Sequence, residues 1–406
     1  MSFERFEHLL ERTMGLSAAS IGTSAIERAV GTRLRACKLE NADDYWTHVQ
    51  RSPDEVQKLV EAVVVPETWF YRDPQAFAAM GRVAMKEWLP AHPTGVLRLL
   101  SLPCSTGEEP YTMAMALIEA GLPNDRFRID AIDISGPSLA SARRGIYGGN
   151  SFRSQDLTFR DRHFAQMERG FRVSEAVRRP VRFTQGNLLG ADFLSGETYD
   201  IVFCRNLLIY FDVDTQNRAV AVLKRLLAPQ GMLFAGHSEA SLMLGHDLAS
   251  AKIPMAFAFR KAAPPIPPKA KPVAARPIQP TATLAKKVPP RRWPVLAFKR
   301  EAPSPDLGEL RRIADRGELA EAARGCEAYM RECGVSPDPL LLLGLISDAS
   351  GNAAAAANYY RKVLYLEPDH AEALGHLALL LKKQGDVTGA KVLNDRMRRL
   401  NARGAA

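Results

Sequence analysis

Two adjacent carboxylates, Glu108 and Glu109, follow a predicted buried strand over residues 96–101 and open a predicted helix. In a doubly wound α/β sheet, the ligand lies over the carboxyl ends of the strands and against a helix N-terminus, which usually binds phosphate. Two glutamates there would repel a phosphate, although the helix dipole itself stabilises acidic side chains in the first turn. The pair therefore favours a ligand that carries an ammonium or sulfonium group, and S-adenosylmethionine is such a ligand.

Polar side chains also follow the next two predicted strands. Asp133 ends the second strand, 26 residues after Gly107, where its carboxylate can accept hydrogen bonds from both ribose hydroxyls of an adenosine. An isolated aspartate at such a place is also often a helix cap. Asn187 and Leu188 follow the third strand, where the amide can recognise an adenine edge while the leucine packs on the ring. Together these residues predict an adenosyl ligand.

The fourth strand brings Asn206 and Tyr210 to the same edge of the predicted sheet. The spacing leaves two interpretations of Tyr210. Its ring can face a cation or steer a transferred methyl group, or it is an amphipathic core residue whose hydroxyl is satisfied elsewhere.

An alternation of strands and helices must position these residues. Apolar runs and helical periodicity over residues 76–260 predict a mostly parallel, doubly wound α/β sheet, which a small insertion at about 146–180 interrupts. The expected strands and helices cover 96–101, 109–119, 127–132, 137–144, 181–185, 199–204, 213–227, 232–236 and 255–260.

The first 75 residues have helical periodicity and predict an N-terminal helical domain. One amphipathic segment over residues 26–39 carries four cations, which form either a solvated basic face or a surface for an acidic partner. These cations are Arg28, Arg33, Arg35 and Lys38.

The net charge of +9 belongs to one segment of the chain. Residues 261–300 contain ten Lys or Arg, ten Pro and no acidic residue, which leaves 44 basic against 45 acidic side chains elsewhere. A segment of this composition is typical of a semi-extended linker, here predicted over 261–303, which is either a solvated spacer or a ligand of an anionic surface. The nearly neutral remainder argues against a nucleic-acid partner.

Cysteine spacing and apolar runs argue against disulfides, metal sites and membrane spans. The five cysteines show no CxxC spacing, so we expect reduced thiols with neither a disulfide framework nor a metal site. No apolar run approaches the length of a membrane span, and the N-terminus has no secretory signal, so we expect a cytoplasmic protein without direct membrane insertion.

A 34-residue period marks the C-terminal part. Gly317, Gly351 and Gly385 recur at this spacing, and three alanines, Ala322, Ala356 and Ala390, recur in the same register. This period is typical of tetratricopeptide repeats. We therefore expect an all-α array of three repeats over 304–400, whose concave face binds a protein ligand that the sequence does not identify.

Six motifs within about residues 1–260 resemble those of a known protein family. They are TWFYR at 68–72, STGEEPY at 105–111, AIDI at 131–134, NLL at 187–189, RNLLIYFD at 205–212 and GHSE at 236–239. In this order they resemble the CheR family of chemotaxis-receptor glutamate O-methyltransferases. With its C-terminal repeats, the chain is similar to the subgroup that serves alternative chemosensory systems such as Wsp-type surface sensing.

The resemblance implies a fold, a reaction and a set of site residues. It implies a methyltransferase sheet that binds S-adenosylmethionine and releases S-adenosylhomocysteine, and a substrate glutamate in the cytoplasmic helical domain of a methyl-accepting receptor. It places Arg72 and Tyr210 beside the reacting methyl group. The cofactor contacts that it implies are Thr68, Arg72, Glu109, Asp133, Asn187, Leu188, Asn206 and Leu207.

Two departures from the family pattern limit the resemblance. Pro66 stands where the family commonly has an asparagine, so one polar cofactor contact is expected to be absent or supplied elsewhere. The glycine-rich loop that grips a receptor's C-terminal peptide in tethering members is reduced to residues 168–173, which argues against peptide tethering.

The chemistry leaves one main alternative function. A glutamate side chain has a reference pKa of about 4.3, so near neutrality it is already an ionised nucleophile. Methyl transfer to it therefore needs alignment of the reacting atoms rather than a general base. We assign Arg72 to positioning the substrate carboxylate. The alternative is a signalling scaffold that binds the cofactor without efficient turnover. Methylation of a nucleic-acid base is disfavoured, because no Asn/Asp-Pro-Pro-aromatic motif follows the fourth strand.

Overall fold

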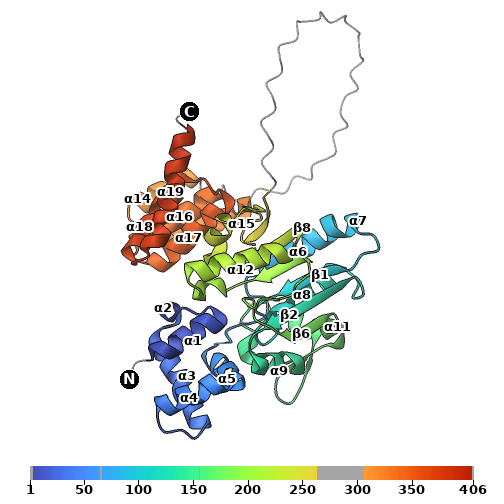
Figure 1. The fold of residues 1–406 in the computed structure, drawn as a ribbon. Coiled ribbons are helices and arrows are strands. Elements are labelled where there is room, and N and C mark those ends of the chain that lie inside the picture. The colour runs from blue at the N-terminus through green and yellow to red at the C-terminus, as the bar shows by residue number, and fades with distance from the viewer. Residues whose placement is uncertain (1–2, 65, 155, 263–305, 405–406) are drawn as a thin grey trace, which may run out of the picture.

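The computed structural model describes residues 3–64, 66–154, 156–262 and 306–404. Along the chain, a group of N-terminal helices, a sheet covered by helices and a C-terminal helical array follow one another (Figure 1). Among the helices of these ranges, none combines the length and apolarity that crossing a bilayer requires. Nearly all of the predicted linker at 261–303 lies outside the described residues.

Seven strands form the central sheet in the order β6-β2-β1-β7-β8-β10-β9. The first five strands of this order pair in parallel, whereas β10 is antiparallel to both β8 and β9. The prediction of a mostly parallel sheet is therefore confirmed, and β9 is a strand that the sequence pattern missed. The strands are β1 (Leu97–Ser101), β2 (Phe127–Asp133), β6 (Val181–Gln185), β7 (Tyr199–Cys204), β8 (Leu227–Ala235), β9 (Leu248–Ser250) and β10 (Ala258–Lys261).

Helices cover both faces of the sheet, as the continuous apolar strands require. On β1, Leu99 packs into a core with α6 (Pro74–Val83) and α8 (Glu108–Glu119). The next residue, Leu100, points to the opposite face and packs with α12 (Val213–Leu226). The short helical turns η1 (Ala84–Trp88) and α7 (Leu89–Ala91) continue from α6, and α9 (Gly136–Arg144) follows β2. The sheet is thus doubly wound, which confirms the predicted fold class.

The N-terminal helices have a core of their own, which includes Phe6, Tyr45 and Leu59. Hydrogen bonds join this group to the loop after β2, where the Gln57 side chain donates to the Ile134 carbonyl (2.8 Å). The predicted basic segment at 26–39 is not wholly a solvated face, because Arg33 turns inward. The helices are α1 (Glu4–Met14), α2 (Ala18–Ile21), α3 (Thr23–Ala36), α4 (Ala42–Arg51) and α5 (Pro53–Val63).

The insertion between α9 and β6 contains a second, three-stranded antiparallel sheet in the order β3-β5-β4. Its strands are too short to produce a periodic pattern, so the sequence showed only an irregular segment. A cluster of aromatic rings holds it to the main domain, with Phe70 stacked on Phe152 and edge-on to Phe164. The elements are β3 (Ile146–Tyr147), η2 (Gly149–Ser151), α10 (Thr158–His163), β4 (Phe164–Gln166), β5 (Phe171–Val173) and α11 (Glu175–Arg178).

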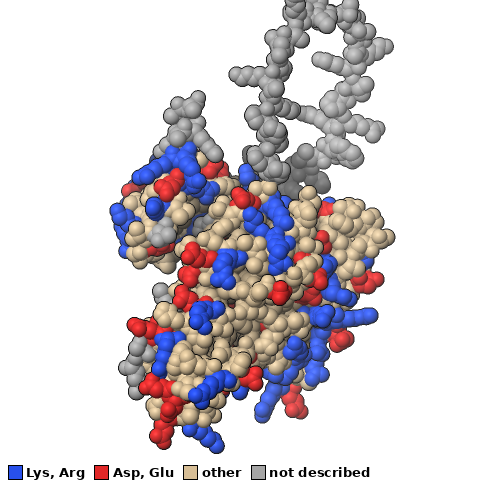
Figure 2. Space-filling view, viewed as in Figure 1, with Lys and Arg blue, Asp and Glu red and all other residues tan. Residues whose placement is uncertain are grey.

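Charged side chains of both signs mix over the face shown in Figure 2, and Lys and Arg are more frequent beside α9 and α11. Arg143, Arg144 and Arg179 are exposed there. The mixed surface agrees with the near balance of charge that the sequence shows outside 261–300.

Six helices form the C-terminal array, and the residues of the 34-residue period occupy equivalent places in it. Gly317, Gly351 and Gly385 each have a positive φ, of 86°, 76° and 87°, just after a helix ends. A Cβ on Gly344 would lie 2.6 Å from the Tyr360 ring, so two helices meet closely there. This geometry fits tetratricopeptide repeats, and their identification stays a prediction. The helices are α14 (Leu307–Asp315), α15 (Leu319–Cys333), α16 (Pro337–Ala349), α17 (Ala353–Leu366), α18 (Ala371–Lys383) and α19 (Val387–Gly404).

One tyrosine fastens the array to the sheet domain. Tyr365 of α17 is 1% exposed and packs against Phe257 and Phe259, with ring centroids 5.1 and 5.5 Å away. Its hydroxyl accepts a hydrogen bond from the Ala258 N–H (2.9 Å) and lies 3.2 Å from the Ala258 carbonyl. The array therefore packs directly on β10, beside α12 (Figure 1).

Candidate active site

The candidate site residues gather where the parallel strands end. The loops after β1, β2, β6, β7 and β8 lie at this edge, together with the segment at 66–73 that precedes α6. Five non-glycine residues in these segments have positive φ, a strained conformation that is frequent at functional sites. They are Tyr71, Asp73, Ser105, Leu194 and Asn206.

Asp133 ties together the loops after β1 and β2. Its Oδ2 accepts a hydrogen bond from the Ser105 N–H (2.8 Å), and its Oδ1 accepts one from the Ser135 N–H (2.9 Å). The side chain is 3% exposed, and burial raises its pKa while these hydrogen bonds oppose the shift. Since each carboxylate oxygen can accept more than one hydrogen bond, Asp133 keeps acceptor capacity for ribose hydroxyls.

The two carboxylates that open α8 have different surroundings. Glu108 accepts hydrogen bonds from the hydroxyls of Thr106 (2.7 Å) and Ser151 (2.8 Å), so it braces the loop and the insertion. Glu109 accepts one from the Ser101 hydroxyl (2.9 Å) and pairs with Arg205. Burial raises the pKa of Glu109, and the Arg205 guanidinium opposes that shift. Glu109 is the member of the pair that the resemblance places in the cofactor set, and this assignment stays a prediction.

Arg205 is a buried residue to which the sequence analysis gave no role. It is 6% exposed, and its guanidinium donates to Glu109 Oε2 (3.2 Å), to the Arg72 carbonyl (3.0 Å) and to the Asp73 carboxylate. It therefore joins the end of β7 to α8 and to the segment that carries Arg72. The sequence could have indicated this role, because an arginine at the end of a buried strand needs anionic partners.

Arg72 is held by its own segment. Its Nη1 donates to the Glu67 carbonyl (3.1 Å), and its guanidinium lies 4.5 Å from the centre of the Trp69 ring. Thr68 is half-buried in the same segment, whereas Pro66 is exposed. These contacts orient the guanidinium while leaving most of its donors for a ligand.

Glu239 positions the loop after β7. It lies in η4 (His237–Glu239), and its buried carboxylate accepts four backbone N–H groups, at distances of 2.7–3.0 Å. Burial raises the pKa of Glu239 while these hydrogen bonds oppose the shift. The donors are Asn206, Leu207, Leu208 and Gly236. The bonds hold Asn206 at a φ of 58° and so fix both Asn206 and Leu207 at the strand edge.

Tyr210 ends the same loop, in η3 (Leu208–Tyr210). Its side chain is 37% exposed, so it is not a core residue with a buried ring. The Ser17 N–H donates to its carbonyl (2.9 Å), which fixes the tyrosine against the N-terminal helices. Its exposure leaves the ring free to face a cation or to steer a transferred methyl group, and that role stays a prediction.

Asn187 and Leu188 follow β6 as predicted, and the asparagine is already hydrogen-bonded. Its Nδ2 donates to the Thr13 carbonyl (2.6 Å), and its Oδ1 accepts from the Leu189 N–H (3.0 Å). Leu188 is buried in the core beside α12. An adenine contact by Asn187 is therefore left to the second N–H of its amide or to the remaining lone pair of Oδ1.

The residues at this edge fit S-adenosylmethionine. The Ser105 hydroxyl is buried next to Asp133 and has no hydrogen-bond partner among the described residues, so a polar ligand can satisfy it. Asp133 and Glu109 are the carboxylates that we predict to lie beside an adenosyl sulfonium with an ammonium group, and Arg205 balances part of the charge of Glu109.

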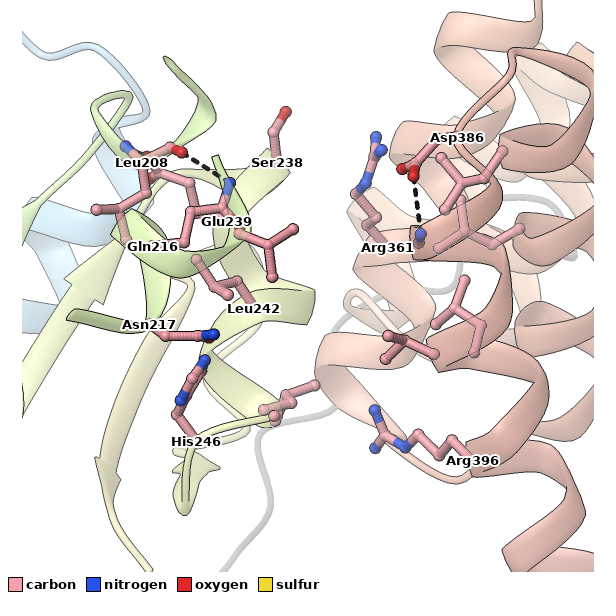
Figure 3. A pocket seen from close by; sticks show the side chains of 18 of the residues that line it. Leu208, Gln216, Asn217, Ser238, Glu239, Leu242, His246, Arg361, Asp386 and Arg396 are labelled. Atoms are coloured by element: carbon pink, nitrogen blue, oxygen red, sulfur yellow. Dashed lines mark hydrogen bonds between the residues drawn. The ribbon is translucent and has the colours of Figure 1, made fainter. Parts of the chain in front are cut away.

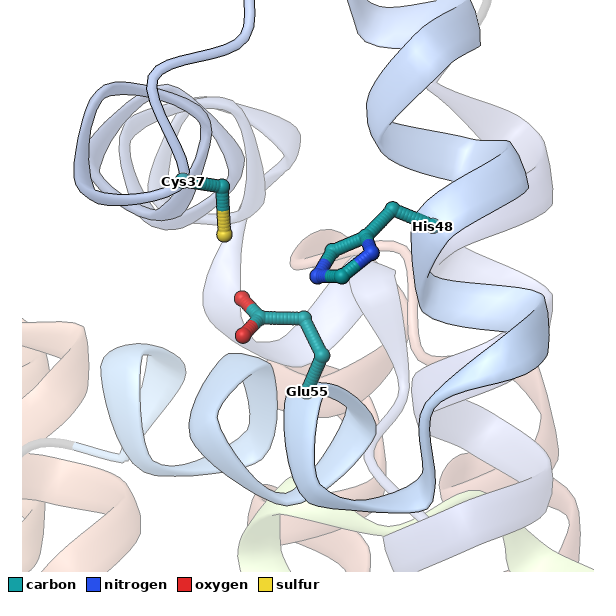
Figure 4. A group of neighbouring side chains, drawn as sticks. All are labelled: Cys37, His48 and Glu55. Carbon is teal, nitrogen blue, oxygen red and sulfur yellow. The ribbon is translucent and has the colours of Figure 1, made fainter.

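A second cluster, in the N-terminal helices, has the composition of a metal site. The nearest ligand atoms of Cys37, His48 and Glu55 lie within 4.8 Å of one another (Figure 4). However, Arg33 donates to both Glu55 oxygens (2.9 and 3.1 Å), and the Tyr45 hydroxyl donates to Oε1 (3.1 Å). Because a guanidinium already balances the carboxylate, we interpret this cluster as a structural ion pair.

Replacing Glu55 by glutamine is expected to lower the free energy of unfolding of the N-terminal helices by about 3 kcal/mol at pH 7, because Arg33 loses its buried partner. Its partners lower the pKa of Glu55 in the folded state, against the cost of burial. The stabilisation by the ion pair is therefore complete above the pKa that Glu55 has in the unfolded chain. It disappears as the pH falls through the pKa that Glu55 has in the folded protein.

Urea unfolding of the wild type and the variant at pH 7 and at pH 3 measures this effect. The difference between the proteins should shrink at the lower pH. Asp54→Asn, at the exposed neighbouring position, is the control. A difference that is equal at both pH values would show that the ion pair is not responsible.

Comparison with known proteins adds an independent finding. The family described as "CheR methyltransferase, all-alpha domain" matches residues 1–64, and "CheR methyltransferase, SAM binding domain" matches residues 66–256. A "Probable biofilm formation methyltransferase WspC" of Pseudomonas aeruginosa is 46% identical over 98% of this chain and 98% of its own length. The protein of the same name from Pseudomonas putida is 42% identical with the same coverage. "Chemotaxis protein methyltransferase 2" of Pseudomonas aeruginosa is 35% identical over 61% of this chain and 89% of its own length.

Proposed function

Because the chain belongs to the CheR methyltransferase family, we propose that it methylates glutamate side chains in the cytoplasmic helical domain of a methyl-accepting chemotaxis-type receptor. The observation that carries the proposal is the match of the SAM-binding family over residues 66–256, together with the edge of the sheet that gathers Asp133, Glu109 and Arg72. The names of the relatives, which mention chemotaxis and biofilm formation, support a receptor pathway. We place the protein in the cytoplasm, where such receptor domains lie.

The cofactor supplies a methyl group on a sulfonium, an electrophile that an ionised carboxylate attacks directly. The chain then has three tasks, which are to bind the adenosyl group, to orient the glutamate and to exclude water. We assign the first task to Asp133, Asn187, Leu188, Asn206 and Leu207. Thr68, Arg72 and Glu109 complete the cofactor-binding set.

Arg72 has the right chemistry for orienting the substrate. Its guanidinium can donate to one carboxylate oxygen and leave the other oxygen free to attack. Its contacts with Trp69 and with the Glu67 carbonyl restrict its position. We place Tyr210 beside the transferred methyl, since its exposed ring stands at the end of the loop that Glu239 fixes.

Transfer of labelled methyl from S-adenosylmethionine to receptor cytoplasmic fragments tests the proposal. The full-length protein should label at least one fragment, and mild alkali should release the label as methanol, because a glutamate ester hydrolyses there while methylated nitrogen does not. Replacing the acceptor glutamates by alanine in the fragment is the matched control. Tight binding of S-adenosylhomocysteine without transfer to any fragment would instead favour a signalling scaffold, and alkali-stable label would contradict ester formation.

A further inference from the structure

A cleft of about 730 Å³ separates the sheet domain from the C-terminal array (Figure 3). One wall comes from η3, η4, the start of α12 and α13 (Ala240–Leu244), and the other from α17, α18 and α19. We call it the interdomain cleft. Its volume lies within the range of clefts that bind ligands in proteins.

The interdomain cleft adjoins the candidate active site. Leu208 and Ile209 line it and directly precede Tyr210. Glu239 also lines it, and this residue holds the backbone of Asn206 and Leu207. A chain segment that lay in the cleft would therefore run past the place where we expect the acceptor glutamate.

Both walls present apolar side chains to solvent. Ile209 and Val213 on the sheet domain are 38% and 53% exposed, and Val392 on the array is 58% exposed. Large apolar side chains that face each other across a groove are typical of a site for an amphipathic helix.

Arg361 gives the cleft a positive charge that forms no ion pair within the described part of the chain. It is half-buried on α17, and among the described residues it has neither a hydrogen bond nor an ion pair. Burial lowers the pKa of Arg361, and the Asp386 carboxylate opposes that shift. A half-buried, unpaired guanidinium is costly, and a carboxylate from a partner would relieve that cost.

The acidic residues of the cleft already have hydrogen-bond or ion-pair partners. Asp386 accepts the Gly389 N–H (2.7 Å), and Asp369 lies 3.8 Å from Arg396. Glu239 accepts its four backbone donors. Burial lowers the pKa of Lys362, the next residue of α17, and the carboxylate of Asp73, which follows Arg72, opposes that shift. The helix therefore carries a second cation that interacts with the segment of Arg72.

We infer that the interdomain cleft binds an amphipathic, glutamate-bearing helix of the substrate receptor, with a carboxylate on Arg361 and apolar side chains between Val213 and Val392. The C-terminal array then forms part of the substrate site. This inference rests on the proposed function. The chain's own segment at 261–300 does not suit the cleft, because it carries ten cations and no acidic residue.

Kinetics of the full-length protein with a receptor fragment that the wild type methylates test this inference. Arg361→Glu should raise KM for the fragment roughly tenfold or more, the usual scale for removing one charged contact, while kcat and the affinity for S-adenosylhomocysteine stay close to wild type. Arg361→Lys should restore most of the affinity. Val392→Asp, at an exposed position that tolerates substitution, should also raise KM.

Arg312→Glu, in the first helix of the array and 68% exposed in its side chain, is the matched control and should leave KM unchanged. A wild-type KM in both Arg361→Glu and Val392→Asp would overturn the inference while leaving the proposed function intact. If the wild type methylates no fragment but binds one in a way that depends on Arg361, the result would contradict the proposed function alone. Self-association that Arg361→Glu abolishes would show that a second copy occupies the cleft, and would also overturn the inference.

Discussion

Asp133→Ala is expected to weaken the binding of S-adenosylmethionine and S-adenosylhomocysteine by about a hundredfold or more. Two charge-assisted hydrogen bonds to ribose hydroxyls at roughly 1.5 kcal/mol each account for this factor. The substitution also frees the N–H groups of Ser105 and Ser135, which loosens the loop that faces the cofactor. Isothermal titration calorimetry with S-adenosylhomocysteine measures the effect without depending on catalysis.

Asp130→Ala provides the control on the same strand. Asp130 accepts a hydrogen bond from the Tyr199 hydroxyl (3.0 Å) and lies three residues before the end of β2, away from the proposed cofactor site. It should bind S-adenosylhomocysteine as the wild type does. Wild-type affinity in a folded Asp133→Ala protein would remove Asp133 from the cofactor site.

Arg205→Met is expected to reduce kcat/KM for receptor methylation by about a hundredfold or more. Removal of the guanidinium leaves Glu109 buried without its partner, a loss of roughly 3 kcal/mol or more, and releases Asp73 and the Arg72 carbonyl. The segment that carries Arg72 then loses its anchor to β7. Initial rates of labelled methyl transfer measure this loss.

Arg205 acts in our interpretation as a positioning residue, so a second readout separates its role from a general loss of stability. If it acts through Glu109, Glu109→Gln and the double variant with Arg205→Met should show similar rates, because the two side chains form one unit. Arg98→Met, which removes an ion pair to Glu197 at the exposed end of β1, is the control. Strictly additive losses for Arg205 and Glu109 would contradict the coupling.

The sequence alone determined the features that depend on neighbouring residues. The buried strands appear as continuous apolar runs, so the positions at their carboxyl ends, including Asp133 and Asn206, could be read directly from the chain. The 34-residue spacing of Gly317, Gly351 and Gly385 predicted the helical pairs, because only glycine adopts the left-handed turn there without strain. The family motifs then identified the reaction class.

The tertiary structure decided which side chains meet. Arg205 and Glu109 are 96 residues apart, and Tyr365 is 107 residues from Ala258. No local sequence pattern therefore predicts either contact. The same holds for Glu239, which holds the loop after β7 from more than thirty residues away. The interdomain cleft with its unpaired Arg361 exists only because the array packs on β10. Local periodicity reports the burial of one element, whereas a site formed by several elements depends on how they pack.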